Sequence, residues 1–209
     1  MRRALAVLGG LGLTVLASCS LRPAPRAPIA TWDLIGHLPV PRPAVAEPLP
    51  VVFVVHEPAG PLWLDSGSMH YRLGYEDPAR LRRFANSQWA VSPLKLLGQR
   101  LRAALALSAA RGGAVPDLGI PADYSLRVVV EDFGQVFDSP SSSRGVVRFR
   151  VVLVRERKHV FVGQRRFEAV VEAPTADARG GVAALGRATG ESVDEAVAWV
   201  SERVAEDLQ

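Results

Sequence analysis

A single cysteine carries the most distinctive chemistry of this chain. Cys19 is the one thiol in 209 residues, and small side chains, Ala17 and Ser18, stand directly before it. An uncharged stretch runs from Ala4 to Ser18 behind the basic start Met1-Arg2-Arg3. This layout is typical of an export signal. The stretch is shorter than the roughly 20 residues that span a bilayer, so we expect cleavage and not a membrane helix.

The segment that ends in this cysteine resembles a bacterial lipobox. It reads Leu16-Ala17-Ser18-Cys19, and the resemblance implies cleavage before Cys19 and acylation of the new N-terminus, palmitate included. Residues 1–18 would then be a lipoprotein signal peptide, and residues 19–30, rich in Pro and Ala, a lipidated tether. The alternative is an ordinary secretory signal followed by an incidental free cysteine.

The remaining residues, 31–209, are predicted to form a single α+β domain, and the lipobox resemblance implies that this domain is periplasmic. This length buries a core without disulfides. Arg2 and Arg3 leave with the signal, which lowers the formal net charge from +4 to +2. The charge of the mature chain therefore gives little support for nucleic-acid binding. No second stretch is long and apolar enough to span a membrane. We therefore expect a domain that is anchored to a membrane and does not cross it.

Catalytic and metal-binding patterns are weak. The histidines, His37, His56, His70 and His159, are scattered without ligand spacing, so no metal and no cofactor are expected. There is no G-x-S-x-G elbow and no G-x-x-x-x-G-K-[ST] loop. Asp65 near His70 reads more simply as a turn aspartate and a strand histidine than as an acid/base pair. The chain is not expected to be an enzyme.

The first half of the domain predicts short strands and one helix. Val51–Val55 is a β-branched run typical of a strand buried on both faces. Residues 69–73 predict another strand, with 81–86 as its hairpin partner, although Asp77-Pro78 is also compatible with a capped helical turn. Ser92-Pro93 predicts a helix start, and the stripe that follows predicts a helix that stops near Gly112-Gly113. The stripe consists of Leu94, Leu97, Leu101 and Leu105, with Lys95, Arg100 and Arg102 off it.

The second half predicts an antiparallel meander and a long helix. Alternation predicts strands at 124–131, 146–155 and 160–172, with a polar hairpin loop at 138–145 and with Phe161 on the same face as Phe167. A helical stripe follows from 177 to 207, with a possible break before Ser192. The stripe is Val182, Leu185, Thr189, Val193, Val197, Val200 and Val204. The fold class expected is α+β, a two-layer sandwich of a mostly antiparallel sheet with two amphipathic helices on one face.

Two groups of side chains are candidate interaction residues. Arg148, Arg150 and Arg166 lie on the polar side of paired strands and form a candidate basic face for anionic lipid headgroups or an acidic partner. Their alternative role is that of an ordinary solvated sheet surface, because Glu168 and Glu172 lie beside them. Trp63, Tyr71, Arg72 and Trp89 form a candidate partner interface. Their aromatic rings are equally compatible with the core.

The order of motifs between Leu62 and Leu105 resembles the ABC-type transport auxiliary lipoproteins, the family that includes the paraquat-inducible intermembrane transport lipoprotein. These motifs are Trp63-Leu64-Asp65, Met69-His70-Tyr71-Arg72, Leu81, Trp89-Ala90 and Pro93 before the leucine stripe. The resemblance extends from the lipobox to the C-terminal helix. One departure is Gln88, because family members usually carry a basic residue just before the tryptophan.

The resemblance implies a lipid-anchored periplasmic subunit of an ABC-type intermembrane lipid transport system. Its partners would be a mammalian-cell-entry-type substrate-binding protein and the ABC permease and ATPase. A homo-oligomer is a further assembly compatible with the resemblance. Ser20 after the acylated cysteine is consistent with sorting to the outer membrane. The alternative function is that of a lipoprotein assisting outer-membrane assembly or cell-wall attachment.

Overall fold

The computed structural model describes residues 27–34, 47–110, 113–116, 119 and 121–209. Cys19, the signal region, the first part of the tether and His37 lie outside the described residues. Lipidation at Cys19 therefore stays a prediction.

Within the described residues, eight strands pair into one sheet around the long strand β6 (Tyr124–Ser139). β6, β7 (Ser142–Arg155) and β8 (Val160–Glu172) form an antiparallel meander. The other edge of β6 pairs in parallel with β2 (Phe53–Val55) and with β3 (Ser68–Leu73). β3 pairs antiparallel with β4 (Asp77–Trp89), and two short parallel pairs join β1 (Ala30–Trp32) to β4 and β5 (Ala114–Pro116) to β2. The long ladders are thus antiparallel, and the parallel ladders are short.

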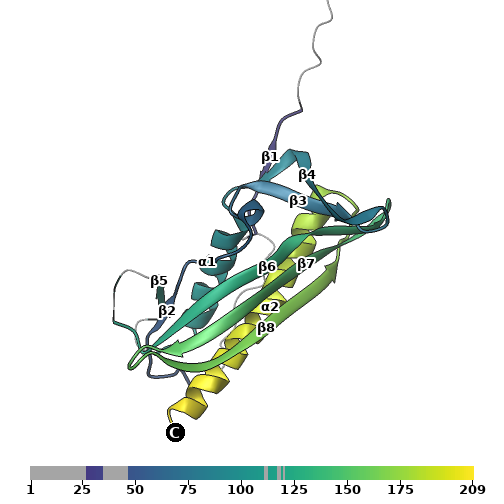
Figure 1. The fold of residues 1–209 in the computed structure, drawn as a ribbon. Helices are drawn as coiled ribbons and strands as arrows, with labels where there is room; N and C mark the ends of the chain where they lie inside the picture. The colour runs from purple at the N-terminus through teal and green to yellow at the C-terminus, as the bar shows by residue number, and fades with distance from the viewer. Residues whose placement is uncertain (1–26, 35–46, 111–112, 117–118, 120) are drawn as a thin grey trace, which may run out of the picture.

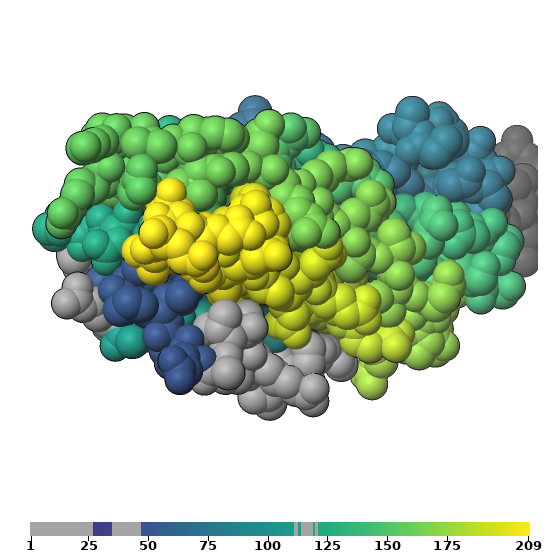
Figure 2. All heavy atoms as spheres, turned by 90° about the horizontal axis from the view of Figure 1, so that it is seen from below, coloured from purple at the N-terminus to yellow at the C-terminus, as the bar shows by residue number. Residues whose placement is uncertain are grey.

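Two helices, α1 (Pro93–Ala106) and α2 (Ala178–Asp207), lie together on one face of this sheet (Figure 1). The predicted two-layer α+β fold is confirmed. The molecule is elongated, with β3 and β4 at one end and the C-terminal end of α2 towards the other (Figure 2). The opposite face of β6, β7 and β8 carries neither helix and is called the open face below.

The start of α1 follows the predicted capping chemistry. The Ser92 hydroxyl accepts the Lys95 N–H at 3.4 Å, and Pro93 occupies the first turn. All four leucines of the predicted stripe are buried. The helix ends at Ala106, before the predicted Gly112-Gly113. Arg100, predicted to lie off the apolar stripe, is buried as well, because α2 packs beside α1 and covers it.

α2 is one continuous helix, which confirms the predicted helix at 177–207, and the alternative with a break before Ser192 does not occur. The Asp177 carboxylate accepts the Gly180 N–H at 2.7 Å and caps the helix start. The Ser192 hydroxyl donates to the Ala188 carbonyl at 2.8 Å and does not cap a new helix. Every member of the predicted apolar stripe is buried.

Two predictions about the meander are corrected. The expected loop at 138–145 is a tight turn, since β6 runs to Ser139 and β7 starts at Ser142. The Ser139 hydroxyl accepts the N–H groups of Ser141 and Ser142 and so stabilises this turn. Phe161 is 61% exposed, because a register shift pairs it with Val154 on the open face. The predicted hairpin of 69–73 with 81–86 is confirmed, with β4 longer than expected.

The core lies between the sheet and the helices. Phe149 and Phe167 stack at 5.6 Å between ring centroids, and Trp199 of α2 covers Phe167 at 5.9 Å. At Gly145 the sheet approaches the backbone of α2 so closely that a Cβ atom would lie 2.7 Å from the Leu185 nitrogen. This packing leaves the open face as the part of the sheet available to other molecules.

Candidate functional site

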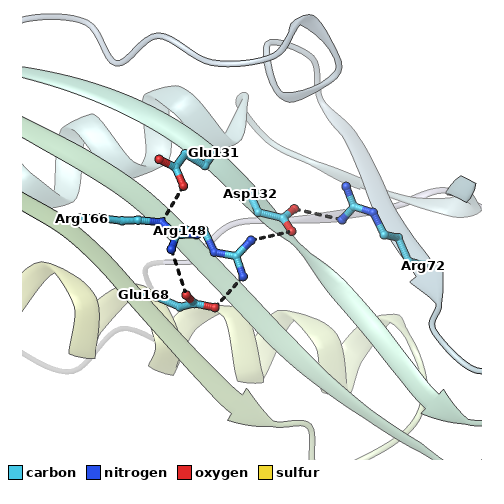
Figure 3. Close-up of polar contacts among 6 residues, drawn as sticks. All are labelled: Arg72, Glu131, Asp132, Arg148, Arg166 and Glu168. Atoms are coloured by element: carbon cyan, nitrogen blue, oxygen red, sulfur yellow. Dashed lines mark hydrogen bonds and ion pairs between the residues drawn. The ribbon is translucent and has the colours of Figure 1, made fainter. Parts of the chain in front are cut away.

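The open face carries a continuous chain of ion pairs that we call the charge ladder (Figure 3). It crosses β3, β6, β7 and β8, and arginines alternate with carboxylates along it. Its members, in order of contact, are Arg72, Asp132, Arg148, Glu168, Arg166, Glu131 and Arg150.

The tightest contacts of the ladder are charge-assisted hydrogen bonds. Arg148 donates to Glu168 at 2.5 Å, and Arg166 donates to Glu131 at 2.7 Å. Arg72 reaches from β3 to Asp132 at 3.0 Å. Because each arginine is shared or closely paired, the side chains are held in defined positions over the sheet.

A β-bulge explains how two adjacent carboxylates reach the same face. The pairing between β6 and β7 shifts between Val130 and Asp132, which leaves Glu131 as the extra residue. Asp132 then lies opposite Arg148. Arg150 and Arg166 lie directly opposite each other, which is unfavourable for like charges, and Glu131 contacts both.

The electrostatics of the ladder stabilise its charged forms. Burial acts to raise the pKa of Glu131, but hydrogen bonds from Arg166 and Arg150 outweigh it and hold that pKa below its usual value. The hydrogen bond from Arg148 lowers the pKa of Glu168, and the same bond raises the pKa of Arg148. These shifts favour the charged forms of Glu131, Glu168 and Arg148.

An aromatic contact continues the ladder at its β3 end. The Arg72 guanidinium lies 5.3 Å from the centre of the Trp63 ring, and the His70 ring meets the same indole edge-on at 5.3 Å. Burial lowers the pKa of His70. Trp63 is partly exposed and follows Leu62, whose side chain is 90% exposed.

The structure thus joins two groups of residues that the sequence presents separately. Arg72 of the candidate interface meets Asp132, which also pairs with Arg148 of the candidate basic face. Tyr71 lies elsewhere, packed against Phe84 and Phe137. Trp89 is buried at 3% exposure and packs against Phe133.

Sequence reasoning missed Glu131 and Asp132 as members of the site. A signal was present, because strict alternation from Tyr124 would put charged Asp132 in the core and Phe133 in water. Only a bulge resolves that conflict. Gln88, the departure from the family pattern, donates to the Thr31 hydroxyl at 3.2 Å and bridges β4 to β1.

In the part of the chain that the structure describes, the geometry gives little support for a metal site or a membrane-spanning helix. Among the described residues, no group of three or more His, Cys, Asp or Glu side chains is placed to hold a metal ion. A hollow of about 570 Å³ at the start of β6 mixes cationic and anionic side chains, with Asp123 and Glu156 beside Arg127 and Arg157. None of the described helices has the length and hydropathy needed to cross a bilayer.

Solved structures share this fold at low sequence identity. Protein XCC0632 from Xanthomonas campestris, a DUF330 protein, matches with a TM-score of 0.72 and 20% identity over 87% of this chain and 97% of its own. Protein CT253 from Chlamydia trachomatis matches with a TM-score of 0.50 and 9% identity, over 73% of this chain and 96% of that chain. These similarities establish the fold.

A comparison with curated proteins found no significant match. The family model described as the ABC-type transport auxiliary lipoprotein component matches residues 36–197, which is most of the domain. Because this match covers more than half of the chain, it shows that the chain belongs to the ABC-type transport auxiliary lipoprotein family.

Proposed function

We propose that the protein is a lipid-anchored, non-catalytic subunit of an ABC-type intermembrane lipid transport system, and that it docks a mammalian-cell-entry-type protein in the periplasm. Membership of the auxiliary lipoprotein family is the observation that carries this proposal. The predicted acylation of Cys19 supports the anchoring. The charge ladder supports a docking role, because fixed complementary charges favour one partner and one orientation over others.

The docking surface in this proposal is the open face from Trp63 to Arg150. Trp63 and Arg72 supply residue types that are enriched at binding hot spots. The ladder around Arg148 offers charges that a partner can engage by exchanging ion pairs. Tyr71 and Trp89 are left out of this surface, since Tyr71 packs against Phe84 and Phe137 and Trp89 is core.

Affinity capture from a detergent extract tests the proposal. The wild-type lipoprotein should recover a mammalian-cell-entry-type protein and its ABC permease and ATPase. The double variant Arg148→Glu with Arg150→Glu should lose them. Lys95→Glu, which reverses an exposed charge on α1, should retain them and controls for charge reversal in general.

The same experiment distinguishes the alternative. Recovery of β-barrel assembly proteins or of peptidoglycan, without any transporter component, would contradict the proposal and favour a lipoprotein for outer-membrane assembly or cell-wall attachment. Fractionation of the envelope tests the proposed outer-membrane location, which Ser20 favours. Cross-linking of the intact lipoprotein tests the proposed homo-oligomer.

A further inference from the structure

One edge of β4 is left without a strand partner over most of its length. β4 pairs with β3 along one edge, and on the other edge β1 covers only Ser87, Gln88 and Trp89. Among the described strands, none pairs with the outer edge from 77 to 86. The side chains flanking this edge are largely exposed, and they include Arg80 and Arg83.

The unpaired edge lies at the end of the molecule where the predicted tether enters. β1 begins at Ala30, at the end of residues 19–30, and it extends the sheet beyond β4. β1 and β4 lie at the end of the molecule opposite the C-terminus of α2 (Figure 1). Ile29 lines the same hollow as Arg83 and Phe84, so the incoming chain passes directly beside β4.

The length of the tether limits how far this edge can be from a bilayer. At about 3.6 Å per residue, the chain from Cys19 to Ala30 spans at most about 40 Å. α2, with 30 residues at about 1.5 Å each, is about 45 Å long. An acylated Cys19 therefore limits the distance of the β4 edge from the membrane to about 40 Å. The C-terminal end of α2 lies about a helix length farther away when the domain stands upright.

The charge of this edge suits an anionic surface. Arg80 and Arg83 are exposed and have no ion-pair partner among the described residues, and both lie within the unpaired stretch of β4. Their long stems can bring both guanidinium groups to the same edge. Arg22 and Arg26 add two positive charges within the tether. Glu76 is paired with Arg82, which leaves Asp77 as the opposing charge of the turn.

We propose that the β4 edge rests on an anionic lipid surface, with Arg80 and Arg83 contacting lipid phosphates, and that this contact holds the domain upright on its anchor. The inference rests on the proposed lipid anchoring. Each arginine near an anionic membrane strengthens such a contact about fivefold. The open face then stands roughly perpendicular to the bilayer and remains accessible to a periplasmic partner.

The test uses the mature lipoprotein reconstituted in vesicles of phosphatidylcholine, with or without phosphatidylglycerol. Acylation consumes the Cys19 thiol, so Ala79→Cys on β4 provides a unique site for a fluorophore. Quenching by nitroxide-labelled headgroups reports contact with the bilayer. Ala198→Cys, exposed on α2, gives the matched probe towards the far end.

We expect stronger quenching at position 79 than at position 198, and an increase at position 79 when phosphatidylglycerol is present. Removing both arginines with Arg80→Ala and Arg83→Ala should lower the contacting population about 25-fold at low salt. Arg127→Ala with Arg157→Ala removes the same charge at the other end and should leave quenching unchanged. High salt should weaken the contact in the wild type, because the screening length shortens.

Equal quenching at position 79 in both kinds of vesicle would overturn the proposal, as would equal losses in the two double variants. Stronger quenching at position 198 would show the reverse orientation and would also overturn it. Mass spectrometry of the same sample distinguishes a wrong orientation from a missing anchor, because an acylated Cys19 confirms that the anchor is present. An unmodified Cys19 would remove the anchor, and the inference would fall with it.

Discussion

Glu131 is the residue that balances the like charges of the open face. It separates Arg150 from Arg166, which the strand register places directly opposite each other. We expect Glu131→Gln to lower the free energy of unfolding by about 0.5–1 kcal/mol, because exposed ion pairs are individually weak. Urea denaturation at low and high salt measures the loss, which should shrink at high salt. Glu172→Gln on β8 is the control, and an equal loss there would contradict the role of Glu131.

Tyr124 provides a pH-dependent reporter of the packing between β6 and α2. Its hydroxyl donates to Asp207 at 2.7 Å, and Arg155 donates to the same carboxylate oxygen at 3.2 Å. Burial, followed by the hydrogen bond to Asp207, raises the pKa of Tyr124 to about 12. Because the folded state favours the protonated phenol, this group contributes its full stabilisation at pH values below the unfolded pKa of about 10. The contribution is lost as the pH rises towards the folded-state pKa of about 12.

Ultraviolet titration of the phenolate should therefore show a late ionisation of Tyr124, at a pH of about 12. In Tyr124→Phe this late phase should disappear, and stability at neutral pH should fall by about 1–3 kcal/mol because a hydrogen bond to a charged group is lost. A late phase that persists in Tyr124→Phe would assign it to another residue.

At the scale of elements, contact between β7 and α2 depends on the absence of a side chain at Gly145. A Cβ atom there would lie 2.7 Å from the Leu185 nitrogen and 2.8 Å from the Ala184 carbonyl carbon, which are backbone atoms that cannot turn aside. We expect Gly145→Ala to destabilise the protein by about 1–3 kcal/mol, as overpacking does. Thermal unfolding measures the effect.

Gly134 on β6 is the matched control for this substitution. It lies opposite Val146, one pair away from Gly145, and a Cβ atom there would be 3.5 Å from its nearest neighbour. Gly134→Ala should leave stability unchanged or raise it slightly, because alanine loses less backbone entropy than glycine. Equal destabilisation by both substitutions would mean that α2 does not set the constraint at Gly145.

The contact between α1 and α2 contains a buried cation with incomplete pairing. The Arg100 side chain is 4% exposed, its nearest carboxylate oxygen on Asp194 is 3.7 Å away, and its Nε and Nη2 atoms lack hydrogen-bond partners. Burial lowers the pKa of Arg100. We expect Arg100→Met to raise the free energy of unfolding by about 1 kcal/mol or more, since an apolar side chain of similar length avoids this desolvation. Denaturant melts in which Arg100→Met is less stable than the wild type would contradict this.

At the scale of the whole molecule, the proposed anchor decides where the domain works. We expect intact mass analysis of the natural product to show Cys19 as an acylated N-terminus, without residues 1–18. Cys19→Ala should retain those residues and lose the acyl chains, because cleavage and acylation both depend on the thiol. Ser20→Ala should still be processed. A wild-type protein with a free thiol would contradict the anchor and the location built on it.

Much of the fold was predictable because its signals are local. The leucines from Leu94 to Leu105 share one face at helical spacing, and Ser92-Pro93 marks the start of their helix. Alternation in β7 and β8 separates Phe149 and Phe167 from Arg148 and Arg166. Each of these signals lies within a few residues along the chain, so no knowledge of the partner strand or helix is needed to interpret it.

The errors have a common physical origin in contacts between distant segments. Arg100 is buried because α2 covers it, and Phe161 is exposed because its pairing with β7 shifts by one residue. Glu131 and Asp132 share a face because of a bulge against β7. Neither a neighbouring helix nor a register shift is encoded in the periodicity of a single element.

The sequence by itself determined both helices, the three strands of the meander, the two-layer α+β class and the family resemblance, since these depend on periodicity and on short motifs. Only the tertiary structure decided that Trp63 and Arg72 adjoin the ladder, that Trp89 belongs to the core, and that β4 leaves an edge beside the tether. The reason is that strand order and register are set by long-range pairing and by the close packing of α2 against Gly145.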